Sequence, residues 1–444
     1  MQNLKTIVEI KNSHSFILLY NRKFLIIFNI SWKFVEIIAI FYYYFLMQYI
    51  PRAIEKTLKT HLERGKSILL LGASQTGKTT LLKHLNVGDL SFTLLDPSVR
   101  LQFEKSPNSL QQQIAAFKQQ KNLSHPPIVI IDEVQKVPEL MDIIQLLIDN
   151  QEAQFILTAS SVRKLRRHAE FNLLPGRVIH LHLDPLALSE LPKPFPEIEL
   201  LLLYGSLPGI YLEKDLQNKQ IDLEAYVKNY LEEEVRGEAL VRQIGSFTKF
   251  LEFSAVEAGN QININKLSQE LGVGRHTITE YFQVLEDCFI AERIEPLTQM
   301  TRRRKLTKTP KYLFFDLGIQ RIAANEGQQL SFKALSQKFE QFVGLELLRF
   351  IRIFMPSAKL CYWRDHAGPE IDFLIEYNKK YLPIEVKWTE TPTLHDAKHI
   401  IKFMNEYDCI KPAYIICRCK SALLLTDDII ALPWQSFDNL LNNF

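Results

Sequence analysis

Short runs of apolar residues recur between positions 67 and 182, and polar stretches with a helical pattern separate them. Two of these runs, Ile68–Leu71 and Ile128–Ile131, contain no polar residue, and the run in QFILTASS is nearly as apolar. Strands that alternate apolar and polar residues bury one face, whereas uninterrupted apolar strands suit a parallel sheet that is covered on both faces. The pattern therefore predicts an α/β domain built on a parallel sheet.

The chain beyond position 196 divides into two further parts. From Leu200 to about Gly245 the pattern is helical, and the next segment predicts a helix–turn–helix whose turn is Gly272-Val273-Gly274. Its core positions would be Leu267, Leu271, Ile278, Phe282 and Leu285. The stretch CFIAERIEPL would supply the strands of a wing, which completes a winged-helix module. After Tyr312, a long helix, three strand patterns, a second helix and two more strands predict a second α/β domain. We therefore place domains at residues 1–46, 47–195, 196–305 and 306–444.

Residues 1–46 differ from the rest of the chain, because they hold eleven aromatic residues and most of a nearly apolar run from Phe24 to Met47. Lys33 and Glu36 interrupt this run, and a charge at the centre of a bilayer costs about 2.5–3.5 kcal/mol on insertion scales. Three interpretations remain open. The segment is a non-native or dispensable extension before a true start at Met47, a membrane anchor through residues 24–50, or a buried helix.

Composition changes this picture little. Apolar residues make up 47% of the 444 and charged residues 23%, which is typical of folded domains and excludes a small disulfide scaffold. A net charge of +3 neither favours nor excludes a nucleic-acid partner. The five cysteines show no paired metal-ligand spacing, and their odd number suggests a reducing compartment. We expect a cytoplasmic protein, or a membrane-anchored one if residues 24–50 insert.

The most informative motif follows the first apolar strand. The stretch GASQTGKT matches G-x-x-x-x-G-K-[ST] between a strand and a helix, which is the context that a phosphate-binding loop requires. Its glycines let backbone N–H groups wrap a phosphate, and the helix N-terminus adds a favourable dipole. Lys78 would reach the β- and γ-phosphates of ATP, and the Thr79 hydroxyl would bind Mg²⁺. The predicted nucleotide contacts are Gly72, Ala73, Ser74, Gln75, Thr76, Gly77, Lys78, Thr79 and Thr80.

Two adjacent carboxylates supply the second half of this predicted site. Asp132 and Glu133 follow the strand Ile128–Ile131 at its carboxyl end, where open α/β sheets bind their ligands. Asp132 would hold Mg²⁺ through water, and Glu133 would orient and deprotonate the attacking water. The sequence therefore predicts a catalytic ATP site.

Polar residues after two later strands leave alternatives open. Thr158, Ser160 and Ser161 end the third strand, and Ser160 is our candidate sensor of the γ-phosphate, although each hydroxyl would equally well cap the next helix. Arg177 is a candidate arginine finger, acting in cis or on a neighbouring subunit of a homo-oligomer; the alternative is a surface ion pair. The basic residues Arg163, Lys164, Arg166 and Arg167 would form a solvated face or meet phosphates.

Several motifs together carry a family resemblance: GASQTGKTT, IVIIDEVQKVPEL, LTASS, PGRVIHLHLDPLALSE and YGSLPGIY. Because these motifs occur in this order, the chain from about Met47 to Trp388 resembles a family of bacterial and archaeal AAA-type ATPases. Members carry a C-terminal domain of unknown function that is similar to PD-(D/E)xK nucleases, and they usually begin near what is Met47 here. Two positions depart from the family pattern, because Ser74 replaces the usual arginine and Ala159 the usual glycine.

The helix–turn–helix has two possible roles. In a DNA-reading module, Arg275, His276, Thr277 and Thr279 would face the groove, and Arg302-Arg303-Arg304-Lys305 would meet the phosphate backbone. Glu280, Glu286 and Asp287 make the second helix a poor phosphate binder, so a purely structural connector is the alternative. Upstream of it, Glu232, Glu233 and Glu234 are most simply a solvated face.

Two strands near the C-terminus predict a metal site. If Asn378-Lys379 form a two-residue hairpin turn, Tyr377 pairs with Lys380, and the same register brings Asp372 opposite Glu385 and Glu370 opposite Lys387. These four side chains would share one face, and D-x(12)-E-x-K is the arrangement of a PD-(D/E)xK metal site. Asp372 and Glu385 would hold a second divalent metal, Mg²⁺ or Mn²⁺, and Lys387 would position the attacking water. Glu340 would support the metal from the preceding helix, and Trp363 and Arg364 would line the substrate.

These observations predict a P-loop ATPase domain, a winged-helix connector and a restriction-endonuclease-like α/β domain. The first functional hypothesis is an ATP-driven, Mg²⁺-dependent enzyme that acts on DNA or RNA. The alternative is an ATP-gated interaction or regulatory module whose C-terminal domain binds without cleaving.

Overall fold

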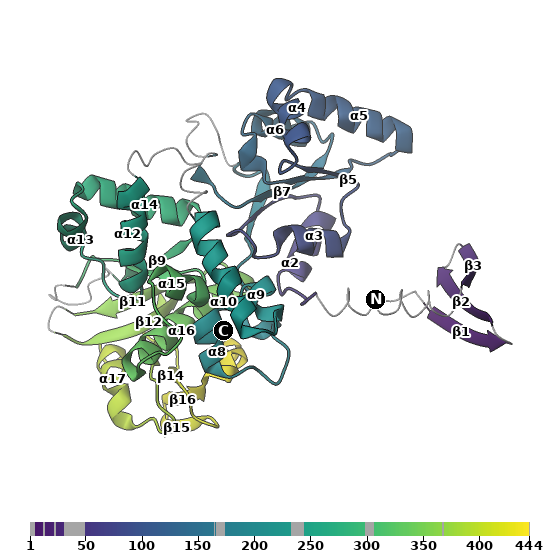
Figure 1. Cartoon of the computed structure of the whole chain (residues 1–444). Coiled ribbons are helices and arrows are strands. Elements are labelled where there is room, and N and C mark those ends of the chain that lie inside the picture. The colour runs from purple at the N-terminus through teal and green to yellow at the C-terminus, as the bar shows by residue number, and fades with distance from the viewer. Residues whose placement is uncertain are drawn as a thin grey trace. The chain divides into compact units, whose positions relative to one another are not determined.

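The computed structural model describes residues 5–11, 14–21, 24–30, 49–163, 165, 174–231, 244–297, 306–365 and 368–443. The chain divides into two compact units, Met1–Pro51 and Arg52–Phe444. Figure 1 labels many of the helices and strands of both units.

The first unit contains a small antiparallel sheet. Its strands lie in the order β1 (Lys5–Lys11), β2 (His14–Asn21) and β3 (Phe24–Ile30), and β-branched and aromatic residues favour this conformation. The segment predicted as a membrane anchor or a buried helix therefore starts with strand β3. The prediction of a helix is wrong for Phe24–Ile30. The rest of that segment, up to residue 48, lies outside the described residues. In the described part of the chain, no helix has both the length and the apolar character that a membrane crossing needs.

The predicted parallel sheet opens the second unit. All of its neighbouring strands run parallel, in the order β5-β6-β7-β4-β8. The strands are β4 (Ser67–Leu71), β5 (Leu90–Thr93), β6 (Ile128–Asp132), β7 (Gln154–Ala159) and β8 (Val178–His182). Side chains of β6 and β7 are fully buried against the helix that follows β6, as the uninterrupted apolar runs predict.

The first helix of this domain precedes β4, and the others connect the parallel strands. They are α2 (Glu55–Glu63), α3 (Lys78–Leu85), α4 (Pro97–Lys105), α5 (Ser109–Lys121), α6 (Leu140–Asp149) and the short 3-10 helix η1 (Val134–Lys136). In α6 the residues Leu140, Ile144 and Leu147 are fully buried at helical spacing. Burying such an apolar stripe supplies most of the stability of a short helix.

A helical region follows, and its second half contains the predicted helix–turn–helix. Gly272 ends the first helix with a φ of +65°, and Gly274 precedes the second. Four of the five predicted core residues are buried and Leu271 is half-buried. The elements of this region are η2 (Leu188–Glu190), α8 (Ile198–Tyr204), α9 (Pro208–Leu212), α10 (Leu216–Ala225), η3 (Tyr226–Leu231), α12 (Ile244–Val256), α13 (Ile264–Leu271) and α14 (Arg275–Asp287).

The C-terminal part is built on an eight-stranded mixed sheet in the order β10-β9-β11-β12-β13-β14-β16-β15. Its strands are β9 (Ala291–Pro296), β10 (Lys311–Phe314), β11 (Lys359–Arg364), β12 (Glu370–Tyr377), β13 (Lys380–Val386), β14 (Ala413–Cys417), β15 (Leu423–Thr426) and β16 (Ile429–Pro433). Its helices are α15 (Leu317–Ala323), α16 (Phe332–Phe354), η4 (Leu394–Ala397), α17 (Lys398–Met404) and η5 (Trp434–Asn443). The sequence missed β16, which pairs with both β14 and β15.

The strand expected to form the wing belongs to this same sheet. This strand is β9, which pairs antiparallel with β10 and parallel with β11. The eight-stranded sheet therefore includes a strand that lies before the expected boundary at residue 305. The predicted hairpin is confirmed, since Tyr377 pairs with Lys380, and Asn378 and Lys379 have the positive φ angles of a type I′ turn.

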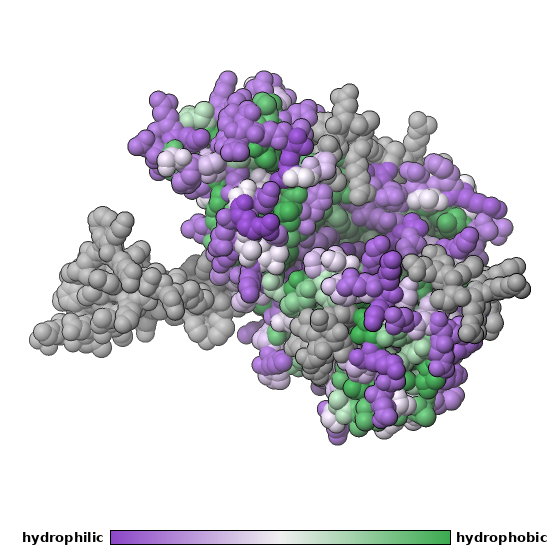
Figure 2. All heavy atoms as spheres, turned by 180° about the vertical axis from the view of Figure 1, so that it is seen from behind, coloured by the Kyte–Doolittle hydropathy of each residue, from purple (hydrophilic) through white to green (hydrophobic). Residues whose placement is uncertain are grey.

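On the face that Figure 2 shows, hydrophobic areas are small and scattered among polar side chains. All five cysteines are free, and four of them are buried. Burial raises the pKa of the Cys361 thiol to about 12, so this side chain behaves as a small apolar group.

Candidate functional site

The phosphate-binding loop lies between β4 and α3, as the motif predicts. Gly72 has a φ of +151°, and a Cβ atom there would lie 2.3 Å from the carbonyl oxygen of Leu183. Gly77 has a φ of +98° at the residue before α3. Both positions favour glycine because their φ angles are positive. Gly72 also has no room for a side chain, because the backbone of Leu183 lies so close.

Lys78 holds the centre of this loop. Its side chain is buried, and Nζ donates hydrogen bonds to the carbonyl oxygens of Gly72 at 2.8 Å and Ala73 at 3.0 Å. The same ammonium group lies 3.8 Å from Glu133 Oε1. A fixed cation at the start of a helix provides the electrostatic setting that an anionic phosphate needs.

Thr79 and Asp132 lie together, and their oxygens fit a magnesium ion. Thr79 Oγ1 donates to both carboxylate oxygens of Asp132, at 3.0 and 3.2 Å. Thr158 Oγ1 donates to Asp132 Oδ1 at 2.6 Å and accepts from the backbone N–H of Glu133 at 2.9 Å. Hydroxyl and carboxylate oxygens are the ligands that Mg²⁺ prefers, so this group of residues suits the predicted metal.

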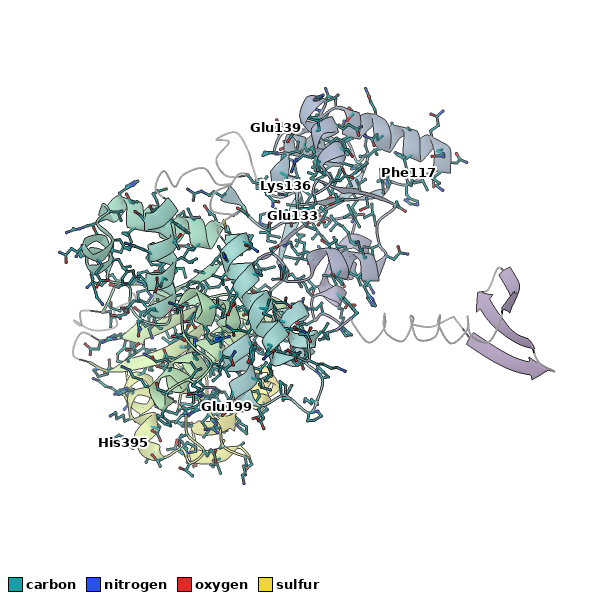
Figure 3. All side chains as sticks on the ribbon, in the orientation of Figure 1. Phe117, Glu133, Lys136, Glu139, Glu199 and His395 are labelled. Atoms are coloured by element: carbon teal, nitrogen blue, oxygen red, sulfur yellow. The ribbon has the colours of Figure 1, made fainter. Side chains whose placement is uncertain are left out.

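Glu133, which Figure 3 labels, is held in an unusual backbone conformation. Its φ is +61°, a left-handed value that a residue with a side chain adopts only when its surroundings impose it. Ser160 Oγ donates to Glu133 Oε2 at 2.6 Å, and Gln135 Nε2 donates to the same oxygen. Gln135 Nε2 also donates to Ser160 Oγ at 2.9 Å. One carboxylate oxygen is thereby fixed, and the other faces Lys78.

Sequence reasoning missed Gln135 and Arg52. Gln135 is buried two residues beyond the carboxylate pair, where its amide could have been recognised only from the three-dimensional contact with Ser160. Arg52 is also buried, and its Nη1 donates to the carbonyl oxygen of Thr76 at 2.8 Å. Arg52 therefore braces the loop from a segment that precedes it by some twenty residues.

The other predicted nucleotide contacts also lie on this loop or at the start of α3. Gln75 and Thr80 are exposed, whereas Thr76 is buried and donates from Oγ1 to the carbonyl oxygen of Ala73 at 2.9 Å. The hydroxyl of Tyr226 donates to the carbonyl oxygen of Ser74 at 3.3 Å, which links η3 to the loop.

Arg177 lies far from this site. It precedes β8, and the parallel pairing of Ser67 with Val178 and of Leu71 with His182 places it at the opposite end of the sheet from the loop. Five residues of strand span roughly 13 Å. Its Nε and Nη2 donate to the two carboxylate oxygens of Asp149 at 2.7 and 3.0 Å. A finger role in cis is therefore wrong, and a role on a neighbouring subunit stays a prediction.

The residues after β7 contact the helix–turn–helix. The backbone N–H of Val162 donates to the carbonyl oxygen of Asp287 at 2.9 Å, and Arg163 Nη1 donates to its side chain at 3.3 Å. Ser161 lies 3.6 Å from the thiol of Cys288. Arg163 is thus buried in a contact between domains and not part of a solvated basic face. Lys164, Arg166 and Arg167 lie outside the described residues.

The predicted DNA-facing residues begin α14. Arg275, His276 and Thr279 are exposed, and Thr277 is half-buried. These positions leave contact with DNA as a prediction. Glu232, Glu233, Glu234 and the run Arg302–Lys305 lie outside the described residues.

The strands β12 and β13 bring the predicted C-terminal site together. Asp372 Oδ2 accepts a hydrogen bond from the backbone N–H of Val386 at 2.8 Å, one residue beyond Glu385. Lys387 Nζ donates to Glu385 Oε1 at 2.6 Å. Burial and the nearby Asp372 raise the pKa of the Glu385 carboxyl above its usual range. Lys387 lowers this pKa, but its effect is weaker. Burial also raises the pKa of Asp372.

A second lysine, which sequence reasoning missed, enters this site from β10. Lys311 Nζ lies 2.7 Å from Glu370 Oε1 and 3.3 Å from Glu340 Oε1. Burial opposes its charge, but Glu340 and Glu370 raise its pKa above the usual range. Arg364 also pairs with Glu370, at 2.9 Å.

Trp363 does not line this site. It is fully buried and packs edge-on against Phe403. The prediction that it contacts substrate is wrong, because the pleat of β11 turns this residue into the core.

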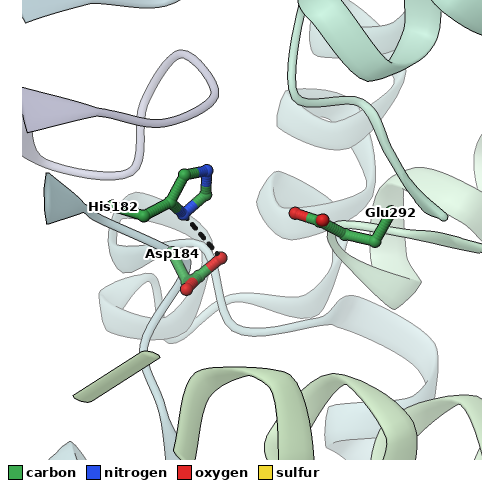
Figure 4. A group of neighbouring side chains, drawn as sticks. All are labelled: His182, Asp184 and Glu292. Carbon is green, nitrogen blue, oxygen red and sulfur yellow. Dashed lines mark ion pairs between the residues drawn. The ribbon is translucent and has the colours of Figure 1, made fainter. Parts of the chain in front are cut away.

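Figure 4 shows a separate group formed by His182, Asp184 and Glu292. In the described part of the chain, these three are the side chains whose ligand atoms all lie within 4.8 Å of one another. Arg352 pairs with Asp184 at 2.6 Å and with Glu292 at 2.7 Å. Burial opposes ionisation of Asp184, but Arg352 and His182 hold its pKa below the usual range. Arg352 pairs with both carboxylates, and His182 pairs with Asp184, so this group is an ion-pair network that links the end of β8 to β9.

Comparison with known protein families agrees with the first of these sites. Residues 64–192 match the model of the AAA domain. The chain contains an AAA-type P-loop domain. Residues 196–338 match a domain of unknown function (DUF8612), and residues 336–437 match another domain of unknown function (DUF4143).

Related proteins give no further functional label. Uncharacterized proteins of Mycobacterium tuberculosis and Mycobacterium bovis are each 22% identical over 380 residues, which cover 85% of this chain and 82% of theirs. A solved structure, the Walker-type ATPase PABY2304 of Pyrococcus abyssi, has 17% sequence identity and a TM-score of 0.44. The match covers 62% of this chain and 96% of that one.

Proposed function

We propose that the protein binds ATP with Mg²⁺ and hydrolyses it at the loop between β4 and α3. The observation that carries this proposal is the position of Glu133, whose Oε1 lies 3.8 Å from Lys78 Nζ while Ser160 and Gln135 hold Oε2. A carboxylate that is fixed by one oxygen and faces the loop lysine with the other is suited to accept a proton from a water that attacks the γ-phosphate.

The neighbouring residues have complementary roles in this proposal. Thr79 and Asp132 would hold Mg²⁺, which neutralises phosphate charge when it is bound. Lys78 would exchange its loop carbonyl contacts for phosphate oxygens. Thr158 would fix the positions of Asp132 and of the Glu133 backbone relative to each other, because its hydroxyl forms a hydrogen bond with each.

Replacing Lys78 by alanine is expected to weaken ATP binding about 10- to 100-fold, which corresponds to the roughly 1.5–3 kcal/mol of a hydrogen bond to a charged group. Calorimetric titration with ATP and Mg²⁺ measures this change. Lys83→Ala is the matched control, because Lys83 is exposed on the same helix. Equal affinities for the two variants would contradict the assignment of Lys78.

A second candidate function concerns the C-terminal domain: metal-dependent cleavage of DNA or RNA. One observation favours it. Glu385 Oε2 is buried beside Asp372 and has no hydrogen-bond partner, and a buried carboxylate oxygen of this kind requires a cation or a proton. Asp372 and Glu385 would hold the metal, and Lys387 would stabilise the negative charge that develops during cleavage.

Lys387→Met is expected to abolish cleavage while the protein still binds Mn²⁺, because the lysine is not a ligand. Glu385→Gln is expected to lose both. Incubation with single- and double-stranded DNA and RNA in Mn²⁺ or Mg²⁺ measures cleavage, and Lys398→Met is an exposed control. If wild type cuts none of them, the domain is a binding module, and stimulation of ATP hydrolysis by nucleic acid becomes the test of an ATP-gated role.

A further inference from the structure

The C-terminal site holds four carboxylates, and the contacts divide them into two pairs. Glu340 and Glu370 share Lys311, and Glu370 also pairs with Arg364. Asp372 and Glu385 lie on the neighbouring strands β12 and β13 and have Lys387 beside them. The two pairs differ in what their charges still require.

The pair around Lys311 is already balanced. Two carboxylates face one lysine and one arginine, so their formal charges cancel. Lys311 is 4% exposed, and its ammonium lies 4.9 Å from the centre of the Tyr362 ring. A buried ammonium with two carboxylates and an aromatic face is held in place, because withdrawing it would leave buried charges unpaired.

The pair formed by Asp372 and Glu385 is not balanced. Lys387 pairs directly with Glu385, and Lys311 acts on Asp372 as well as on its own two partners. The four carboxylates of the site therefore share three cations, which leaves one formal negative charge when all four are ionised. Glu385 is 4% exposed, and its Oε2 has no hydrogen-bond partner, whereas Asp372 Oδ2 is satisfied by the backbone of Val386. The unpartnered oxygen therefore marks the point where the pair still needs a proton or a bound cation.

We propose that Lys311 is the built-in cation of this site, so that the domain binds one divalent metal through Asp372 and Glu385 and not two. Lys311 occupies the position between Glu340 and Glu370 that a second ion would take. Glu340 is then a partner of Lys311 and not a metal ligand. In agreement with this, the ligand atoms of Glu340, Asp372 and Glu385 do not form a group within 4.8 Å of one another in the described part of the chain. This inference rests on the metal site of the second candidate function but not on cleavage.

The test is a titration with Mn²⁺ alone, followed by electron paramagnetic resonance of the free ion. Every sample is the full chain with Asp132→Asn, which removes the metal position of the ATP site. We expect one bound Mn²⁺ in this background, none after Glu385→Gln and one after Glu340→Gln. Lys311→Met is expected to bind two, because Glu340 and Glu370 lose their shared cation.

Lys338→Met is the matched control, since Lys338 is also buried and pairs with Glu326 at 2.8 Å away from this site. It should still bind one ion. Two ions in the background protein, or the loss of one after Glu340→Gln, would overturn the proposal even if Lys311→Met fails to fold. One ion in both the background and a folded Lys311→Met would also overturn it. No bound ion at all would reject the metal site itself, whereas one ion without cleavage would reject only the proposed cleavage.

Discussion

The Glu133→Gln variant is expected to bind ATP as tightly as wild type and to hydrolyse it about 10²- to 10⁴-fold more slowly, the usual contribution of a positioned general base. The amide keeps the size of the side chain, so the hydrogen bond from Ser160 to the remaining oxygen can persist. It cannot accept the proton of an attacking water. Phosphate release during steady-state turnover measures the effect.

Glu139→Gln is the matched control for this experiment. Glu139 follows the same strand by a few residues and is exposed (Figure 3), so its replacement should leave turnover unchanged. Equal turnover of wild type and Glu133→Gln would show that another group accepts the proton. Loss of ATP binding in Glu133→Gln would instead indicate that the carboxylate supports the loop through Lys78.

Replacing Arg349 by methionine is expected to lower the free energy of unfolding by about 3–5 kcal/mol, the usual effect of breaking a buried ion pair. Arg349, on α16, is buried, and its Nη1 lies 2.6 Å from Glu346 Oε1. It also donates to the carbonyl oxygens of Leu186 and Phe315 and to Ser206 Oγ. Its loss leaves the carboxylate of Glu346 buried without its cation.

Denaturant unfolding followed by circular dichroism measures this loss. Arg293→Met is the control, because Arg293 pairs with Glu295 at 2.7 Å but is exposed, and such pairs contribute about 0–1 kcal/mol. The double variant Glu346→Gln with Arg349→Met should recover part of the stability. Equal unfolding of Arg349→Met and Arg293→Met would mean that the contacts of Arg349 with Leu186, Ser206 and Phe315 contribute little to stability.

The sequence by itself determined the local elements and the motifs that lie on them. Uninterrupted apolar runs predicted the parallel strands, because a strand buried on both faces has no polar side to show. The glycines of the phosphate loop, the pair Asp132-Glu133 and the hairpin turn at Asn378-Lys379 were equally visible. In each case the residues that matter are neighbours along the chain, so local geometry fixes their relation.

Only the tertiary structure decided which distant residues meet these motifs. Gln135 and Ser160 follow the neighbouring strands β6 and β7 and contact each other at the ends of these strands. Lys311 contacts Glu340 and Glu370 from the edge strand β10. The pairing of β9 with β11 joined the expected wing strand to the C-terminal sheet, and the direction of β8 placed Arg177 at the end of the sheet away from the phosphate loop. The local pattern of apolar and polar residues does not predict such contacts, because the order of the strands and the packing of distant segments depend on how the whole core forms.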